Sequence, residues 1–411
     1  MKKLLLIFMI FILAISPIAA NDWNTFQENI AHTGYLEDAS DFVSNLWCTD
    51  LGSPIKSSPA ILDNFMYIVT SNGILKSIDM STGKVDMDLD LDAKSNSSCV
   101  IHNGTLYVGT EKGLKAINID KKKVTWEFDT SSSIESTPFV TNDTIFFGCN
   151  DGHLYGLDFN GNKTVDVDLG GNRKSSPIVT NDSVFIGSTN TKFYCLDLNG
   201  KEKWTATTGD EIYSTPAANE DIVIIGSNDG NLYSYNITNG NLCWKTSLDN
   251  KIRGSFSIDD YDNNVYAGSD SGNLTCVDVR DGNIKWSFST GAPVVSTPAL
   301  KDNKIAFGSD NGYGYVLNKY SGQQEFSYNP GTLLFNSPIS SSPVIYGNSL
   351  FFAGEDGYVY SLDIDKEATP LPVFFYYTLL VIIVVIIILA IVIKLAKGSK
   401  KQKVKKEKDK K

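Results

Sequence analysis

Side chains able to carry out catalysis occur in this chain, but their spacing matches no catalytic site. The segment 268–272 (GSDSG) is similar to the serine turn of a hydrolase, yet its serines do not stand where a nucleophile elbow places one. The three histidines, His32, His102 and His153, lack the spacing of zinc ligands. We therefore interpret 268–272 as a hairpin turn, and the sequence predicts neither a Ser-His-Asp triad nor a zinc site.

Four aspartates offer oxygen atoms of the kind that Ca²⁺ prefers. Asp86, Asp88, Asp90 and Asp92 alternate with apolar residues, so in a β-strand all four carboxylates share one face. The glycine and the distal glutamate of an EF-hand loop are absent. We interpret the alternation as the solvated side of an outer strand, with a calcium site as the alternative.

Six cysteines are spread along the chain with no CxxC spacing and no adjacent pair, which argues against a metal site. An even number in an exported domain permits disulfides, and buried free thiols are the alternative. The spacing does not give a pairing for these residues, which are Cys48, Cys99, Cys149, Cys195, Cys243 and Cys276.

Internal repetition indicates which elements must position any site. Ser-Ser-Pro or Ser-Thr-Pro recurs along the chain, and Cys99 and Phe256 fill two gaps of double length. The resulting anchors are 39 to 45 residues apart and are Pro59, Cys99, Pro138, Pro177, Pro216, Phe256, Pro298 and Pro343. Repeats of this length with strand chemistry are typical of propeller blades.

Each repeat contains four short runs rich in β-branched and aromatic residues. In the third repeat the runs are 136–140, 144–148, 153–158 and 164–169, separated by Asn, Asp and Gly residues that favour tight turns. No segment of the repeats has a convincing apolar period of 3.6 residues. The sequence therefore predicts an all-β fold, an eight-bladed β-propeller of four-stranded antiparallel blades.

A second marker indicates how the ring of blades closes. It is a large apolar residue in the fourth run of each repeat: Trp47, Met87, Trp126, Val165, Trp204, Trp244, Trp286 and Phe326. Trp47 precedes the first anchor, whereas the last repeat, 341–363, ends after three runs. We therefore expect the strand around 46–51 to complete the last blade beside 358–362, which removes an open sheet edge.

The anchors and a set of glycines resemble a known family. Gly83, Gly240 and Gly322 each lie between the third run and the apolar marker, and with the S-S/T-P anchors they resemble pyrroloquinoline-quinone-type (PQQ-like) propeller repeats over most of 46–363. The segment 23–35 is similar to the N-terminal lead-in of such proteins. The family includes quinone-dependent alcohol dehydrogenases and also scaffolds, such as the propeller lipoprotein of the outer-membrane barrel assembly machinery.

The resemblance to the dehydrogenases implies long inter-strand insertions, a vicinal cysteine pair over the quinone, and a calcium ion near a catalytic aspartate. In this chain the repeats are compact, no two cysteines adjoin, and no residue matches that aspartate. We therefore expect no PQQ, no calcium and no enzymatic activity, with a PQQ-dependent dehydrogenase as the alternative.

One set of positions varies while its neighbours repeat. The residue three before each anchor is expected to lie in a ring around the central channel: Lys56, Asn96, Glu135, Lys174, Tyr213, Arg253, Val295 and Ser340. Variable positions of a structural repeat are free to contact a ligand, and three cations would face a common volume. Our candidate binding residues are therefore Lys56, Glu135, Lys174, Tyr213 and Arg253, with ordinary solvated variation as the alternative.

The chain ends predict export and a membrane anchor. Residues 1–20 combine two lysines, an apolar run and a small-residue end, as a signal peptide does. Residues 371–393 are uncharged and long enough to cross a bilayer, and the ten lysines of 394–411 predict a cytoplasmic tail. We expect a single-pass protein of the cell membrane. Its predicted outer segments are the lead-in 21–45, the propeller 46–365 and the linker 366–370.

The predicted outer domain is strongly acidic, which argues against a nucleic-acid partner. The chain carries −11, a sum that includes ten lysines against two acidic residues in the tail and two lysines in the leader, so the remainder carries about −21. Seven N-x-S/T sequons are candidate glycosylation sites: Asn96, Asn103, Asn142, Asn162, Asn181, Asn236 and Asn273. We expect a scaffold that binds an extracytoplasmic protein or glycan, with an enzyme or a signalling receptor as alternatives.

Overall fold

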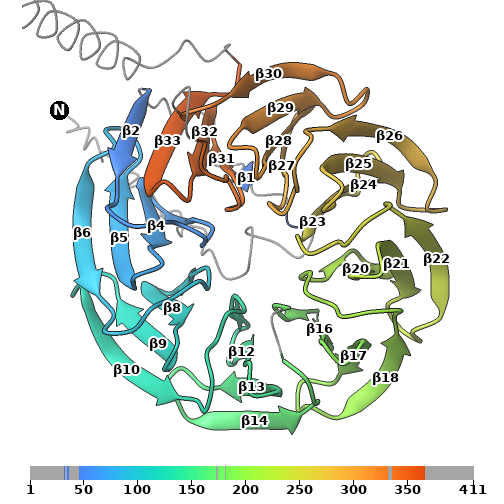
Figure 1. Ribbon diagram of the computed structural model, residues 1–411. Helices are drawn as coiled ribbons and strands as arrows, with labels where there is room; N and C mark the ends of the chain where they lie inside the picture. Colours follow the sequence, from blue (N-terminus) through green and yellow to red (C-terminus); the bar gives the residue numbers. More distant parts are fainter. Residues whose placement is uncertain are drawn as a thin grey trace, which may run out of the picture. The chain divides into compact units, whose positions relative to one another are not determined.

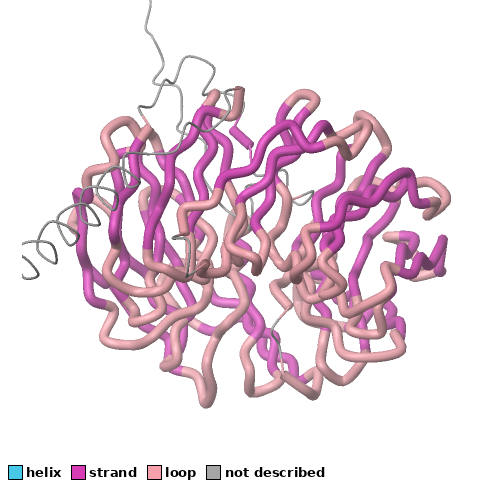
Figure 2. The backbone as a smooth tube through the Cα atoms, turned by 45° about the horizontal axis from the view of Figure 1, so that its top comes forward, coloured by secondary structure: helices cyan, strands magenta, loops and turns pink. Residues whose placement is uncertain are grey.

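A computed structural model of the 411-residue chain describes His32 and residues 35–36, 46–172, 175–180, 182–331 and 336–365. Every regular element among these residues is a β-strand, and the strands form eight sheets arranged in a ring (Figure 1). We name the middle of this ring the central channel. The loops that join the strands gather at the two faces of the ring (Figure 2). This arrangement confirms the predicted eight-bladed β-propeller.

In blades 1 to 7 the strands run in chain order from the channel to the outer edge. Blades 1 to 4 are β3 (Ala60–Leu62), β4 (Phe65–Val69), β5 (Ile74–Asp79), β6 (Val85–Asp90); β7 (Val100–His102), β8 (Thr105–Gly109), β9 (Gly113–Asn118), β10 (Lys123–Asp129); β11 (Phe139–Val140), β12 (Ile145–Gly148), β13 (His153–Leu157), β14 (Lys163–Asp168); and β15 (Ile178–Val179), β16 (Val184–Gly187), β17 (Lys192–Leu196), β18 (Glu202–Thr207). Blades 5 to 7 are β19 (Ala217–Ala218), β20 (Ile222–Gly226), β21 (Asn231–Asn236), β22 (Leu242–Ser247); β23 (Phe256–Asp259), β24 (Asn264–Gly268), β25 (Asn273–Asp278), β26 (Ile284–Ser289); and β27 (Ala299–Lys301), β28 (Lys304–Gly308), β29 (Gly314–Asn318), β30 (Gln324–Tyr328). Blade 8 instead has the order β1 (Tyr35–Leu36), β31 (Val344–Tyr346), β32 (Ser349–Ala353), β33 (Tyr358–Asp363), β2 (Trp47–Asp50).

The N-terminal strand β2 closes the ring as predicted. It pairs antiparallel with β33, placing Trp47 opposite Ser361 and Asp50 opposite Tyr358. The first and last blades are also joined at their inner strands, because the amide of Ser342 donates to Oγ of Ser58 at 3.0 Å. The last blade is therefore completed by the start of the propeller, and its outer edge is not left open.

The recurrent serines and tryptophans join each blade to the next. The amide of Thr137 in blade 3 donates to Oγ of Ser176 in blade 4 at 2.8 Å. Nε1 of Trp286 in blade 6 donates to the carbonyl of Lys319 in blade 7 at 3.0 Å. The same tryptophan bond occurs in the pairs Trp47–Met80, Trp126–Phe159, Trp204–Ile237 and Trp244–Val279. Both sequence markers are thus contacts between blades, which explains why they repeat.

The glycine before the marker strand is required by this tryptophan contact. Gly322 has φ +69°, and a Cβ built on it would lie 2.6 Å from Cδ2 of Trp286. Gly291 has a similar φ of +81° but no atom within 4 Å of such a Cβ. The two glycines therefore separate the effect of backbone conformation from that of the close approach to the neighbouring blade.

We predict that Gly322→Ala destabilises the propeller more than Gly291→Ala. Both variants place a side chain in the left-handed region, at about 1–2 kcal/mol, and Gly322→Ala adds overpacking against Trp286 worth about 1–3 kcal/mol. Denaturant midpoints of the two variants measure the difference. Equal midpoints would contradict a close contact between Gly322 and the tryptophan.

The cysteines are free thiols. All six lie in the described part of the chain; Cys99, Cys149, Cys195 and Cys276 are buried, whereas Cys243 is exposed. Burial raises the pKa of Cys99 to about 12, so this thiol is protonated at neutral pH. Of the two alternatives left open by the sequence, the structure has free thiols, four of which pack as small apolar side chains.

Part of the lead-in lies inside the central channel, which the sequence did not indicate. The short strand β1 pairs in parallel with the inner strand β31, with Tyr35 opposite Ile345 (Figure 1). His32 is fully buried: its Nδ1 donates to the carbonyl of Phe256 at 3.1 Å, and Oγ of Ser257 donates to the His32 carbonyl at 2.8 Å. The lead-in therefore contacts blades 6 and 8 from within the channel.

We predict that acidic pH loosens this segment. Burial lowers the pKa of His32 from 6.5 to about 4, against the opposing effect of the bond to the Phe256 carbonyl. Between pH 6.5 and about 4, His32 binds a proton in the released segment but not in the bound segment. The free energy of opening therefore falls by about 1.4 kcal/mol for each pH unit below 6.5 in this range. Hydrogen exchange of the peptide containing His32, corrected for intrinsic rates, measures this. His32→Gln should remove the dependence, and a pH-independent wild type would contradict the prediction.

No helix among the described residues is long and apolar enough to span a membrane. The predicted signal peptide 1–20, membrane span 371–393 and basic tail 394–411 lie outside the described residues.

Candidate binding surface at one mouth of the channel

Two loops of every blade reach the same face, because neighbouring strands are antiparallel: the loop before the first strand and the loop between the second and third strands. We name the channel opening on this face the first mouth. One backbone hydrogen bond joins these two loops in each blade. In blades 6, 7 and 8 it runs from Asp270 to Lys251, from Asp310 to Pro293 and from Glu355 to Pro338, each at 2.9 Å. The two loops are thus held together in the same way in every blade, although their side chains differ.

The two described cations of the predicted ring lie beside carboxylates. Nζ of Lys56 is 3.8 Å from Oε2 of Glu355 in the neighbouring blade 8. Nε of Arg253 lies 2.9 and 2.8 Å from the two carboxylate oxygens of Asp270 in its own blade. Ser340, another ring position, donates from Oγ to Oε1 of Glu355 at 2.8 Å. Each cation therefore has a neighbour that offsets its charge.

The charges of both ion pairs act on the carboxyl group of Asp310. Its side chain is half-buried, and this burial raises the pKa of its carboxyl group. Glu355 and Asp270 add to the increase, whereas Arg253 and Lys56 oppose it. Both ion pairs thus influence Asp310, and we name Lys56, Arg253, Asp270, Asp310 and Glu355 the mouth cluster. It contains one more carboxylate than cations.

Two further candidate residues lie at the first mouth on other blades. Oε1 of Glu135 in blade 3 accepts a hydrogen bond from Nδ2 of Asn150 at 2.9 Å. The hydroxyl of Tyr213 in blade 5 donates to Oε2 of Glu211 at 2.7 Å, and this bond raises the pKa of Tyr213 to about 12. Lys174 lies outside the described residues. The described candidate residues Lys56, Glu135, Tyr213 and Arg253 thus lie on loops of the first mouth, while their role in binding stays a prediction.

Sequence reasoning missed the carboxylates of the mouth cluster. Asp270, Asp310 and Glu355 each stand two residues after the second strand of their blade. An alignment of the repeats at the end of that strand, rather than at the serine anchor, could have revealed them. Ion pairing then follows from the shared backbone hydrogen bond, which brings the two loops of each blade together.

The aspartates considered for calcium lie on the outer strand β6 and its following turn, and neighbouring lysines contact them. Asp86 pairs with Lys122 at 2.8 Å, Asp92 pairs with Lys112 at 3.1 Å, and Asp88 pairs with Lys76. In the described ranges no group of three or more His, Cys, Asp or Glu side chains is placed to hold a metal ion.

The GSDSG segment is a hairpin turn, as predicted. It joins β24 to β25, and the amide of Gly272 donates to the carbonyl of Ser269 at 3.0 Å. Oγ of Ser269 lies 2.7 Å from Oγ of Ser271, so the two hydroxyls share a hydrogen bond within the turn.

The sequon asparagines lie at several places on the propeller. Asn96, Asn103, Asn142 and Asn162 are exposed, and Asn236 and Asn273 are half-buried. Asn181 lies outside the described residues. Glycosylation of these sites stays a prediction.

Four-stranded blades, serine anchors and tryptophan contacts between blades define the class of this protein: a β-propeller built of PQQ-like repeats. Residues 87–165, 160–297 and 259–367 match the family model described as outer membrane protein assembly factor BamB. These matches span more than half of the chain, which therefore belongs to this family. The resemblance inferred from the sequence is confirmed.

Solved structures with this architecture include an assembly factor, a designed protein and an enzyme. BamB from Moraxella catarrhalis is 18% identical with a TM-score of 0.68, covering 78% of this chain and 100% of that chain. The computationally designed Ika8 protein is 18% identical with a TM-score of 0.67, covering 76% and 97%. Quinohemoprotein alcohol dehydrogenase from Comamonas testosteroni is 15% identical with a TM-score of 0.70, covering 85% and 81%. These likenesses show the fold alone. No curated protein matches the chain.

Proposed function

We propose that this protein is a membrane-anchored, extracytoplasmic scaffold that binds a protein or a glycan at the first mouth and catalyses no reaction. The observation that carries the proposal is that one backbone hydrogen bond in each blade holds the two loops of the first mouth together, while the side chains on these loops differ between blades. A surface held in place in this way loses little conformational entropy when a partner binds. Membership of the BamB family supports a protein as the kind of partner.

The mouth cluster supplies the polar part of this surface. The side chains of Lys56 and Arg253 are 49% and 42% exposed, so both can contact a partner while they remain beside Glu355 and Asp270. Because cations lie beside carboxylates here, the surface favours a partner that places a negative charge against each cation and a positive charge against each carboxylate. Binding through such groups weakens with added salt.

The membrane part of the proposal rests on the chain ends. We predict that a tag placed after Lys411 is protected from protease added to intact cells, because the lysine-rich tail of 394–411 favours the cytoplasmic side. A second tag, placed between residues 21 and 22, follows the predicted leader 1–20 and should be cut from outside. Cleavage of the C-terminal tag in intact cells would contradict the proposed topology.

Substitution of the ring cations tests the proposed site. In the triple variant Lys56→Ser, Lys174→Ser, Arg253→Ser we expect nearly wild-type stability, since exposed charges contribute about 0–1 kcal/mol each. Capture of the partner crosslinked at the cell surface should fall and lose its salt dependence. The matched control replaces Lys84, Lys121 and Lys201 with serine, which are exposed and lie in the loops between the third and fourth strands, on the opposite face. Equal capture by both triple variants at low salt would contradict binding at the first mouth.

A quinone-dependent dehydrogenase is the second candidate, favoured by the fold match that covers 85% of this chain. Purified protein incubated with PQQ and Ca²⁺ separates the two functions. An enzyme should retain the absorbance of the quinone after desalting and oxidise an alcohol with an artificial acceptor. The scaffold should return to its own absorbance spectrum.

A further inference from the structure

The face opposite the first mouth carries a cavity of about 980 Å³ on one side of the channel. Its lining comes mainly from the turns that join the first and second strands of blades 3 to 6. The inner strands of blades 3, 4 and 5 contain two residues each, whereas those of the other described blades contain three or four. In these three blades a backbone hydrogen bond closes each turn, from Thr141 to Thr144, from Thr180 to Ser183 and from Asn219 to Ile222, and residues of these turns line the cavity.

The lining combines apolar and acidic side chains. Phe139, Val179 and Ala218 belong to the inner strands and form apolar wall. The charged lining residues are Asp143, Asp182, Glu220 and Asp260 against the single cation Lys203. Lys203 is already engaged, because its Nζ lies 2.7 Å from Oδ2 of Asp182. The cavity therefore presents unbalanced negative charge next to an apolar surface.

The lead-in shows what the channel side of an inner strand can bind. Strand β1 adds to the channel edge of β31 in parallel, so an extended segment is already held there by main-chain pairing. The inner strands β11, β15 and β19 have the same edge position in their sheets, and among the described residues no strand pairs with that edge. Blades 3 to 5 thus repeat, beside the cavity, the edge that blade 8 uses to hold a peptide.

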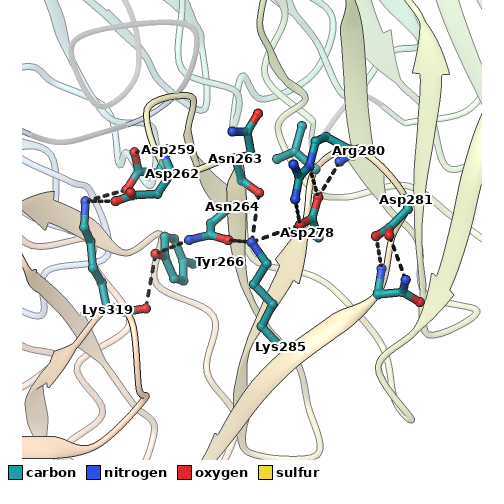
Figure 3. Close-up of polar contacts among 12 residues, drawn as sticks. Asp259, Asp262, Asn263, Asn264, Tyr266, Asp278, Arg280, Asp281, Lys285 and Lys319 are labelled. Carbon is teal, nitrogen blue, oxygen red and sulfur yellow. Dashed lines mark hydrogen bonds and ion pairs between the residues drawn. The ribbon is translucent and has the colours of Figure 1, made fainter.

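The acidic rim is held in position by both neighbouring blades. Oδ1 of Asp260 accepts from Nδ2 of Asn219 in blade 5 at 2.8 Å. The same turn is fixed on its other side by Lys319 of blade 7, whose Nζ lies 2.6 Å from Asp259 and 2.8 Å from Asp262 (Figure 3). Asp260 therefore lies on a turn with little freedom to withdraw from the cavity.

We propose that this cavity binds an extended basic peptide segment, which adds to an inner strand of blades 3 to 5 and places lysine or arginine side chains against Asp143, Glu220 and Asp260. The apolar wall accepts the aliphatic parts of these side chains or the residues between them. This second site is on the face opposite the one used in the proposed function, so either assignment can fail without the other.

A labelled peptide of alternating lysine and valine is a suitable probe, with a glutamate and valine peptide of equal length as its counterpart. Fluorescence anisotropy should show binding of the basic peptide only. The double variant Glu220→Gln, Asp260→Asn should weaken this binding at least about tenfold. The control Asp120→Asn, Asp129→Asn removes two exposed carboxylates from blade 2 and should leave the affinity unchanged. Equal loss in both variants, or none in either, would overturn the proposal.

A steric variant tests the same site without changing charge. Thr238 is exposed and lines the cavity from the turn between the third and fourth strands of blade 5. Ser81 occupies the equivalent position in blade 1, outside the cavity. We expect Thr238→Trp to abolish binding of the basic peptide and Ser81→Trp to leave it intact, with unchanged circular dichroism for both. Undiminished binding by Thr238→Trp would place the peptide elsewhere on the acidic surface.

The glycosylation prediction supplies an independent check, because Asn142 of a sequon lines this cavity. A glycan on Asn142 would occupy the space that the peptide needs. Mass spectrometry of the protein from its own cells should therefore find Asn142 unmodified. Full occupancy of Asn142 would overturn the peptide site.

Discussion

Replacing Lys319 with alanine is expected to lower the free energy of unfolding by about 3–5 kcal/mol. The side chains of Lys319 and Asp259 are each 9% exposed, and Asp262 completes the group (Figure 3). Burial by itself lowers the pKa of Lys319, but its bonds to the two carboxylates raise it overall, so the cation persists at neutral pH. The variant leaves two largely buried carboxylates without their cation.

The matched control is Lys203→Ala, which also removes a lysine beside an aspartate. Lys203 and Asp182 are 31% and 79% exposed, so this pair contributes at most about 1 kcal/mol. Denaturant midpoints of the two variants at neutral pH make the comparison. Equal shifts in the two midpoints would contradict a structural role for the buried group between blades 6 and 7.

Replacing Trp47 with alanine is expected to cost about 3–5 kcal/mol and also to open the ring. Trp47 is 8% exposed and donates from Nε1 to the carbonyl of Met80 at 2.8 Å. Trp244 is 7% exposed and makes the same bond to Val279 at 2.7 Å. Trp244→Ala should therefore cost as much, but its strand β22 follows β21 directly in the chain, whereas β2 is held in blade 8 only by pairing and packing.

Thiol labelling distinguishes the two effects. Cys48 lies on β2 and is half-buried, so detachment of β2 should speed its labelling. In a Cys243→Ser background, which removes the exposed thiol, we expect faster labelling of Cys48 in Trp47→Ala but not in Trp244→Ala. The same labelling rate in both variants under native conditions would contradict closure of the ring by β2.

Features that recur in most blades could be predicted from the sequence. The serine anchors and the tryptophan marker each make one kind of contact between blades, so the contact appears as a period in the chain. The closing strand was predictable for the same reason, since Trp47 is a marker without a repeat of its own. A period in the sequence therefore reveals a contact that has the same local geometry in several blades.

Contacts that occur once could not be predicted in this way. His32 bonds to Phe256, which is 224 residues away, and nothing in the spacing of the chain indicates that contact. The group around Lys319 joins a turn of blade 6 to blade 7 through side chains that other blades lack. The mouth cluster is intermediate, because its positions repeat while its charges do not.

Site-specific photocrosslinking in intact cells tests the proposed scaffold function most directly. A photoreactive residue is placed at Asn96 or Val295 at the first mouth, at Lys123 on the outer strand of blade 2, or at Thr82 on the opposite face of blade 1. We predict one discrete protein or glycoprotein adduct from both first-mouth positions and none from Lys123 or Thr82. Adducts from Lys123 or Thr82 with none from the first mouth would contradict the proposed binding surface.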